Sequence, residues 1–359
     1  MDNKIENTSV PAAEPIPAAE ETPASGTGRK IRMPEMLTVS PSPHIKSPDT
    51  TATVMFDVIL ALIPAFIWGT YVFGIRALAV MAVSVIACVG FEAAAQFLLH
   101  RPVTIRDLSA VVTGLLLAMN LPVSIPLWMP VIGAFFAIVV VKQLFGGIGK
   151  NFVNPALAAR VFLFSWASEM TAFSADGERV TSFAPVLAEG DIVASATPLA
   201  SLKTGTIPSE TIFDMFLGNH AGCIGEVSSL LLLAGGIFLL VQRVITWHIP
   251  VAYIGTVAAL TFLFPQYDGM PVEFMLYELL AGGLMLGAFF MATDYATSPV
   301  TPAGRLIFGV GCGLITVLIR FFGTYPEGVS FSILVMNLLV WYIDKATMPR
   351  RFGGKSNGK

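Results

Sequence analysis

Charged side chains are scarce in this chain of 359 residues: Asp, Glu, Lys and Arg together make up 13%, whereas hydrophobic residues make up 55%. Soluble globular domains carry about 25% charged residues, and the mean hydropathy here is +0.74. These values exclude a soluble globular protein and predict an all-α polytopic membrane protein. The formal net charge of −3 provides no surplus of basic residues for binding a polyanion, so we expect no nucleic-acid partner.

Cysteine is also scarce. Cys88, Cys223 and Cys312 follow no C-x-x-C or other metal-ligand spacing, and two of them lie inside apolar runs. We therefore expect buried, unreactive thiols and no metal site. The alternative is an intersubunit metal site that uses Cys88 or Cys312, for which the local sequence gives no support.

The first 45 residues lack any apolar run that could serve as the core of a signal peptide. They are rich in Pro, Ala, Glu, Thr and Ser, a composition that predicts a disordered tail. The rest of the chain divides by composition into a first membrane repeat, a polar loop region, a second membrane repeat and a basic tail. The predicted boundaries are 1–45, 46–167, 168–226, 227–346 and 347–359.

Apolar segments lie on both sides of the polar region 168–226. A hydrocarbon core about 30 Å thick needs roughly 20 mainly apolar residues per spanning helix. About ten transmembrane helices are predicted, at 54–73, 77–99, 107–119, 125–145, 155–166, 227–241, 249–264, 274–291, 303–322 and 331–343. The stretches before Pro155 and Pro302 cannot continue the preceding helix, which predicts broken or re-entrant helices at these two places.

Two of these connecting segments, 144–155 and 290–299, have similar sequences. In each, a polar residue precedes a proline (Asn154 and Ser298), and an arginine follows a few residues later. Because each half has an odd number of helices, two homologous halves would have inverted topology. We therefore predict two five-helix inverted repeats with a midplane cavity between these segments. The alternative is that both segments are merely tight turns.

Basic residues set the orientation of a membrane protein. Most of them lie on the side that holds both termini, and only Arg76, Arg179, Lys203 and Arg320 fall on the other side. The positive-inside rule thus predicts that both termini are cytoplasmic. It also places the region 168–226 outside the cytoplasm, where we expect it to lie in water.

Asp57, Glu92, Glu278 and Asp294 lie within or at the edge of apolar segments. A charge at the centre of a membrane helix costs about 2.5 to 3.5 kcal/mol, so such residues usually face a cavity, a partner or water. Asp57, Glu92 and Asp294 are therefore candidates for an ion path. Helix capping or interfacial solvation is the alternative for Asp57 and Asp294.

Several separated motifs together resemble the RnfD/NqrB family, and most of all the D subunits of ion-translocating ferredoxin:NAD oxidoreductase (Rnf) complexes. The motifs are Ser42-Pro43-His44-Ile45, Met55-Phe56-Asp57-Val58, Gly146-Gly147-Ile148-Gly149-Lys150-Asn151, Asn154-Pro155-Ala156, Ala292-Thr293-Asp294 and Thr297-Ser298-Pro299. The resemblance covers nearly everything after the N-terminal tail.

The resemblance implies a covalent FMN, joined through its phosphate to a threonine hydroxyl by a separate flavin transferase. The matching position is Thr197, within Ser195-Ala196-Thr197-Pro198, and Thr204 and Thr206 are nearby alternatives. A second, noncovalent flavin, riboflavin, is compatible with the family. From composition alone, the same four residues would be interpreted as an ordinary surface turn.

The resemblance further implies a flavin-carrying subunit that is not catalytic alone and passes electrons across a bacterial cytoplasmic (inner) membrane. Electron transfer would be coupled to transport of Na⁺ or H⁺. The expected partners are the other Rnf subunits, the flavin transferase and membrane lipid. The main alternative from the residues themselves is a secondary solute channel or transporter with inverted repeats, and a structural anchor for redox partners is a third interpretation.

Overall fold

The computed structural model of the chain describes residues 49–173, 197–226, 228–266, 270–323, 325 and 327–349. Every regular element in these ranges is helical, which confirms the predicted all-α fold class. The N-terminal tail, the residues 174–196 and the C-terminal tail lie outside the described residues.

The helices of the first half match the five apolar segments predicted there. They are α1 (Thr51–Phe73), α2 (Ile75–Leu98), η1 (Ile105–Asp107), α3 (Ser109–Met119), α4 (Trp128–Phe135), the π-helical η2 (Phe136–Gln143) and α5 (Pro155–Leu163), followed by η3 (Phe164–Trp166) and α6 (Ala167–Met170). Gly74, with φ of 87°, joins α1 to α2. Such a φ is open to glycine at little cost, so the chain can reverse within one residue.

The second half ends with its two longest helices, whereas the first half begins with its two longest. It consists of α9 (Ser229–Val241), α10 (His248–Leu263), α11 (Pro271–Leu280), α12 (Leu284–Leu286), the π-helical η5 (Gly287–Met291), α13 (Pro302–Phe322) and α14 (Val329–Thr347). Two short helices, α7 (Pro198–Lys203) and α8 (Ile212–Leu217), lie between the halves in the sequence.

Four helices of the described chain, α1, α2, α13 and α14, are long and apolar enough to cross a membrane. A fifth span results if α11 and the segment Leu284–Met291, which meet at a bend of 64°, are counted as one. The remaining apolar helices, α3, α4 with η2, α9 and α10, are shorter than a full span. This pattern agrees with a polytopic membrane protein that has several short or broken helices.

Two details differ from the sequence prediction. The expected continuous helix 274–291 is interrupted at residues 281–283, where Gly282 has φ of 69°. The pairing of the two similar segments differs as well: α13 starts at Pro302, close to the predicted residue 303, and its N-cap is Thr301, which accepts a hydrogen bond from the Gly304 amide at 3.0 Å. The structural counterpart of Asn154-Pro155, which caps and opens α5, is therefore Thr301-Pro302.

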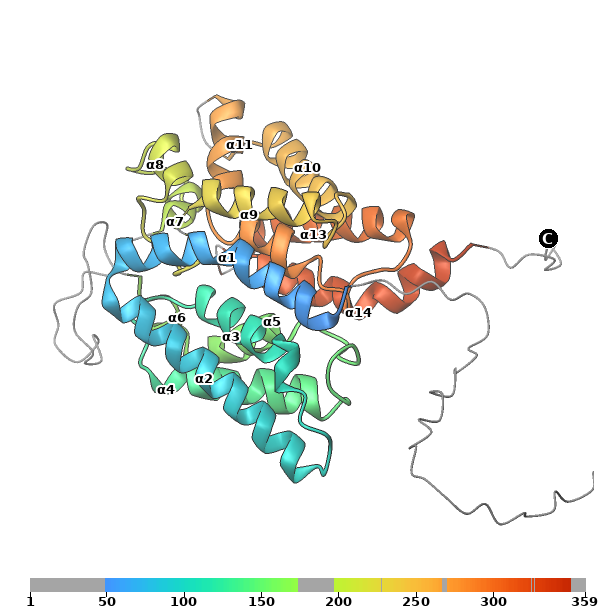
Figure 1. Cartoon of the computed structure of the whole chain (residues 1–359). Helices are drawn as coiled ribbons and strands as arrows, with labels where there is room; N and C mark the ends of the chain where they lie inside the picture. Colours follow the sequence, from blue (N-terminus) through green and yellow to red (C-terminus); the bar gives the residue numbers. More distant parts are fainter. Residues whose placement is uncertain are drawn as a thin grey trace, which may run out of the picture. The chain divides into compact units, whose positions relative to one another are not determined.

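The two halves pack directly against one another. Helix α1 lies along α9 (Figure 1), and α5 contacts α14. At Gly235 of α9, an added Cβ would lie 2.5 Å from the carbonyl oxygen of Ala61 in α1. A glycine is therefore needed for the two backbones to approach so closely, as is common between membrane helices.

The end of the polar region 168–226 returns into the first half. The amides of Ile224 and Gly225 donate to the carbonyl oxygens of Leu121 and Met119, at 3.1 and 2.8 Å. These bonds satisfy carbonyls at and just beyond the C-terminus of α3, and residues 220–226 are buried. The expectation that the whole region lies in water is therefore wrong for its last part.

The preceding helices α7 and α8 cover α11. Leu199, Leu202 and Met215 are buried against Phe274 and Tyr277, forming a small apolar cluster apart from the main core. Part of the polar region, α7 and α8, thus packs against the second half of the protein.

Candidate functional site

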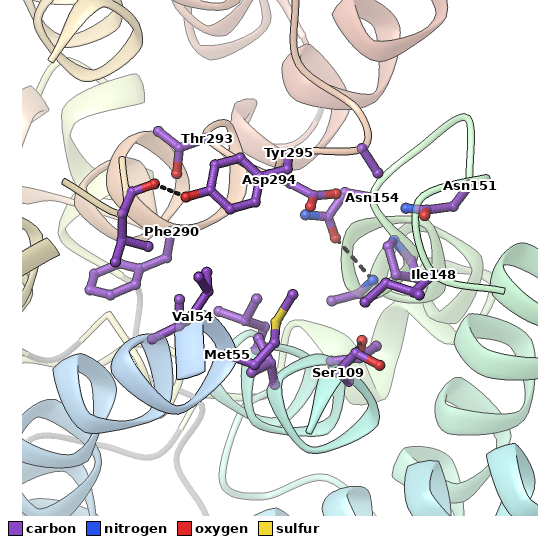
Figure 2. A pocket seen from close by; sticks show the side chains of 18 of the residues that line it. Val54, Met55, Ser109, Ile148, Asn151, Asn154, Phe290, Thr293, Asp294 and Tyr295 are labelled. Carbon is purple, nitrogen blue, oxygen red and sulfur yellow. Dashed lines mark hydrogen bonds between the residues drawn. The ribbon is translucent and has the colours of Figure 1, made fainter. Parts of the chain in front are cut away.

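A cavity of about 350 Å³ lies between the segments 144–155 and 290–299, as their similarity predicts (Figure 2). Such a volume falls within the range of small-molecule sites, about 300 to 1,000 Å³. Its walls include Val54, Met55, Ser109, Lys142, Ile148, Asn151, Asn154, Phe290, Thr293, Asp294 and Tyr295. Both halves therefore contribute to one site, and α1 of the first half forms part of its wall.

The cavity walls are mostly apolar, and a few polar groups lie among them (Figure 2). Asn154 holds this arrangement together: its Oδ1 accepts from the Ala156 amide at 3.0 Å, which caps α5, while its Nδ2 donates to the Met291 carbonyl at 3.2 Å. The side-chain amide of Asn337 is oriented so that its oxygen and its nitrogen both have partners. Its oxygen accepts from the backbone amide of Asn154, and its nitrogen donates to the Thr297 carbonyl. Asn154 thus fixes the first half against the second.

Glu92 lies behind the cavity wall and is 1% exposed. Its Oε1 is 2.8 Å from Lys142 Nζ and accepts from Gln143 Nε2 at 2.8 Å. Lys142 Nζ also donates to Ser109 Oγ at 2.6 Å, and both Lys142 and Ser109 line the cavity. One buried acid is therefore matched by one buried base, and Lys142 connects Glu92 with the cavity.

The other two predicted ion-path residues differ in position. Asp294 lines the cavity, and its Oδ2 accepts from Thr297 Oγ1 at 3.0 Å, which orders the turn before α13. Asp57 is half-buried on α1 and is absent from the cavity wall, although the neighbouring Met55 and Val58 belong to it. The structure thus gathers Glu92 and Asp294 around one site and leaves Asp57 outside it.

Thr197, the predicted flavin attachment residue, is the N-cap of α7. Its half-buried side chain accepts from the Ala200 amide at 3.3 Å. The hydroxyls of Thr204 and Thr206 both donate to the Ser201 carbonyl, at 2.8 and 2.9 Å. Ser195 and Ala196 lie outside the described residues, and attachment of a flavin to Thr197 stays a prediction.

A second buried charge cluster was missed by sequence reasoning. Arg160 of α5 forms an ion pair with Glu327, and its Nη2 lies 3.6 Å from Glu226 Oε1. Its Nη1 also donates to Asn120 Oδ1 at 2.7 Å and to Ser330 Oγ at 3.1 Å. A partial signal was available for the two acids, since Glu226 and Glu327 each lie two or three residues before a long apolar helix, α9 or α14.

A third ion pair holds the break between α11 and α12. Arg320 Nη1 is 2.7 Å from Glu278 Oε2, and its Nη2 donates to the Ala281 carbonyl at 3.1 Å. Glu278, which the sequence places in an apolar segment, is therefore paired with a base. All three cysteines are free and buried, as expected from their apolar surroundings.

These features define an all-helical, polytopic membrane protein with a cavity between two halves and with charged residues buried at its helix breaks. Residues 38–353 match the NQR2, RnfD, RnfE family, and the chain belongs to this family. The resemblance inferred from the separated motifs is thereby confirmed.

Relatives with assigned names match most of the chain. It is 49% identical over 323 residues to the D subunit of the Na(+)-translocating ferredoxin:NAD(+) oxidoreductase complex of Acetobacterium woodii, covering 88% of this chain and 95% of the relative. It is 43% identical over 329 residues to the D subunit of the proton-translocating ferredoxin:NAD(+) oxidoreductase complex of Clostridium ljungdahlii, covering 89% and 96%. The D subunit of the ion-translocating oxidoreductase complex of Stutzerimonas stutzeri is 40% identical, covering 85% and 93%.

Proposed function

We propose that this chain is a flavin-carrying membrane subunit of an ion-translocating ferredoxin:NAD oxidoreductase (Rnf) complex. It would pass electrons across the membrane, coupled to transport of Na⁺ or H⁺, and would be inactive without the other subunits. The observation that carries this proposal is the similarity over nearly the full length to relatives with that name, at 49% and 43% identity.

In this proposal, FMN is attached to the Thr197 hydroxyl through a phosphoester formed by a flavin transferase. The fit rests on the position of Thr197, a half-buried hydroxyl at the first turn of α7, beside the apolar cluster of Leu199, Leu202 and Phe274. Bound FMN would supply one-electron redox chemistry. The protein would hold it in place and exclude water through this cluster.

The cavity between the two halves is the proposed site of the noncovalent riboflavin. Its apolar walls and Phe290 suit a flat aromatic ring, whereas Asn151, Asn154 and Asp294 offer amide and carboxylate groups for the polar edge. A flavin at this place would contact both halves. Its retention would therefore depend on Asn154, which joins them.

Glu92 and Asp294 are the proposed ion-path residues, with Asp57 on α1 as a further candidate. We expect Glu92→Gln to lower ion transport per electron more than it lowers assembly of the complex. Transport of Na⁺ and H⁺ by reconstituted complexes should be measured separately, since the relatives named above include one named for sodium and one named for protons. Unchanged ion transport per electron would remove Glu92 from the path.

The proposal also includes a bacterial inner-membrane location with both termini in the cytoplasm and the residue Thr197 on the opposite side. Impermeant thiol labelling of cysteines introduced near residue 205 and near residue 355 tests this orientation in intact cells. We expect labelling only near residue 205. Labelling near residue 355 instead would reverse the orientation.

A second candidate function is a secondary solute channel or transporter, favoured by the cavity between two halves with broken helices. Denaturing electrophoresis under ultraviolet light, after co-expression with a flavin transferase, separates the two functions. We expect a fluorescent band that is lost in Thr197→Val and retained in the matched control Thr204→Val. No fluorescence in the wild type would favour the transporter, and a full signal in Thr197→Val would refute the assignment of Thr197.

A further inference from the structure

Arg160, Glu226 and Glu327 form the junction cluster, in which one base faces two acids. Their side chains are 2%, 6% and 15% exposed. They come from three places in the chain: α5, the buried end of the region 168–226, and the segment before α14. A charge that is removed from water must be compensated by an opposite charge. The single positive charge of Arg160 can compensate only one of the two carboxylates.

Glu327 is the acid that Arg160 neutralises. Its Oε1 accepts from Arg160 Nη1 at 3.1 Å, and its Oε2 pairs with Arg160 Nη2. The amide of Gly283 donates to the same Oε1 at 3.3 Å. A two-pronged arginine contact of this kind strongly favours the ionised carboxylate. Although burial opposes ionisation, the Arg160 guanidinium therefore holds the pKa of Glu327 below its usual range.

Glu226 is much less well compensated. Its Oε1 lies 3.6 Å from Arg160 Nη2 and accepts no hydrogen bond from the described residues. From the described residues, its Oε2 receives one long bond, from the Cys223 amide at 3.4 Å. A buried carboxyl group with so few donors is stabilised by binding a proton.

The two carboxyl groups meet beside Gly283. A Cβ added there would lie 2.9 Å from Glu327 Oε1 and 3.0 Å from Glu226 Oε1, so a glycine is needed to make room for both oxygens. Both oxygens therefore face the same space beside Gly283. Since two carboxylates cannot donate, a hydrogen bond between them forms only when one of them carries a proton.

The groups around Glu226 leave its charge unmatched. His220 lies close to it beyond Gly222, but burial lowers the pKa of His220 to about 4, so this ring is neutral. Burial also keeps the Cys223 thiol protonated by raising its pKa. Arg320, which lies beside Glu327 at Gly282, is paired with Glu278.

We propose that Glu226 and Glu327 share one proton and form a proton-binding site whose occupancy responds to the redox state of the flavin on Thr197. The redox response rests on the proposed function, whereas the shared proton follows from the junction cluster alone. A metal ion fits poorly because hard cations require about six oxygen ligands and the guanidinium group stands 3.6 Å from Glu226 Oε1. Burial first, and the charge of Glu327 second, raise the pKa of Glu226 to about 8.

The helix that follows Thr197 reaches this site. A Cβ added at Gly282 would lie 3.4 Å from Leu199 Cδ2, 3.4 Å from Arg320 Nη2 and 3.7 Å from Glu327 Cγ. Reduction of a flavin held at Thr197 would add negative charge near the cluster. A like charge raises the pKa of a carboxyl group, so Glu226 takes up a proton from water on reduction and releases it on oxidation.

Difference infrared spectroscopy on the full-length protein in its complex tests the proton site without relying on the flavin. We expect a protonated-carboxyl band that disappears as the pH rises, with a midpoint near 8. Glu226→Gln should abolish this band, and the matched control Glu92→Gln, in the balanced Glu92–Lys142 pair, should retain it. A band that survives Glu226→Gln, or no titrating band at all, overturns the proposal.

Should Glu226→Gln fail to accumulate, Glu226→Asp separates the two carboxyl groups by one methylene and is expected to lower the midpoint. The redox response has its own measurement: reduction with dithionite should shift the midpoint to higher pH in the wild type and leave it unchanged in Thr197→Val. A titrating band that does not move on reduction, in protein shown by fluorescence to carry flavin, refutes the coupling. Absence of fluorescence refutes the flavin attachment. The pH titration of the carboxyl band then still tests whether Glu226 and Glu327 share a proton.

Discussion

Two buried charge clusters of this protein differ in their balance of acid and base. In the first, Glu92 meets Lys142 at 2.8 Å, one acid for one base. In the junction cluster, Arg160 meets both Glu226 and Glu327. Because an uncompensated buried charge costs several kcal/mol, the balanced pair can persist as ions, whereas the unbalanced cluster needs a proton.

The two clusters also differ in their position relative to the proposed flavins. Lys142 and Ser109 connect Glu92 with the cavity between the halves. The junction cluster lies instead against the helix that follows Thr197. The number of bases around each buried acid thus separates Glu92, which has a base of its own, from Glu226, which shares one with Glu327.

The largest expected effect comes from removing the base of the junction cluster. Arg160→Met leaves Glu327 without its partner and Asn120 without its donor. Breaking a buried ion pair in this way costs about 3 to 5 kcal/mol, so we expect strongly reduced yield and a lower thermal unfolding midpoint in detergent. The control Arg106→Met changes an exposed arginine and should behave like the wild type. Normal stability of Arg160→Met would show that the cluster is not an ionic one.

Breaking the balanced pair should cost somewhat less. In Lys142→Met, Glu92 loses its base but keeps the bond from Gln143. We expect the free energy of unfolding to fall by about 3 kcal/mol, the lower end of the range for breaking a buried ion pair. The double variant Lys142→Met/Glu92→Gln should regain most of it, as judged by the same unfolding midpoint. No recovery in the double variant would contradict the ion pair as the cause.

Separating the two carboxyl groups is expected to have a moderate effect. Gly283→Ala places a methyl group 2.9 to 3.0 Å from two carboxyl oxygens, and such overpacking typically costs about 1 to 3 kcal/mol. Gly255→Ala in α10 is a matched control, because a Cβ there meets nothing within 4 Å. Thermal unfolding of the two variants side by side measures the difference, and equal midpoints would argue against the close approach at Gly283.

The smallest effect, taken over a single pH unit, is the dependence of stability on pH. Since the pKa of Glu226 is raised to about 8 from 4.5, its contribution is complete below pH 4.5 and is lost as the pH rises towards 8. The slope reaches at most about 1.4 kcal/mol per pH unit. Glu226→Gln should be less sensitive than the wild type in this window. Parallel curves for the two proteins would mean that Glu226 is ionised throughout.

The sequence predicted the fold class and the cavity well, for physical reasons. Long apolar runs such as α1 and α2 have no other solution in a membrane, and a polar residue before proline marks helix starts such as Asn154-Pro155. The break at residues 281–283 was missed because Ala281, Gly282 and Gly283 lie inside an apolar run. Ser298-Pro299 and Thr301-Pro302 both have a polar residue before a proline, a pattern typical of a helix start. The structure shows which of them begins the helix, because Thr301 accepts the capping hydrogen bond from the Gly304 amide.

The site was predictable only in part. Asp294 and Asn154 lie in the two similar segments, so their meeting at one cavity followed from the sequence. Arg160, Glu226 and Glu327 are far apart in the chain, and nothing local indicates that they meet. Thr197 was singled out by family resemblance, because a threonine before proline has no signal of its own for a flavin.

The central claim is that Thr197 carries a flavin, and the mass of the peptide that contains Thr197 tests it most directly. Protein co-expressed with a flavin transferase is digested, and the peptide is analysed by mass spectrometry. We predict a peptide heavier by one FMN minus one water, with fragment ions that place the added mass on Thr197. An unmodified peptide, or an added mass on Thr204 or Thr206, would contradict the account.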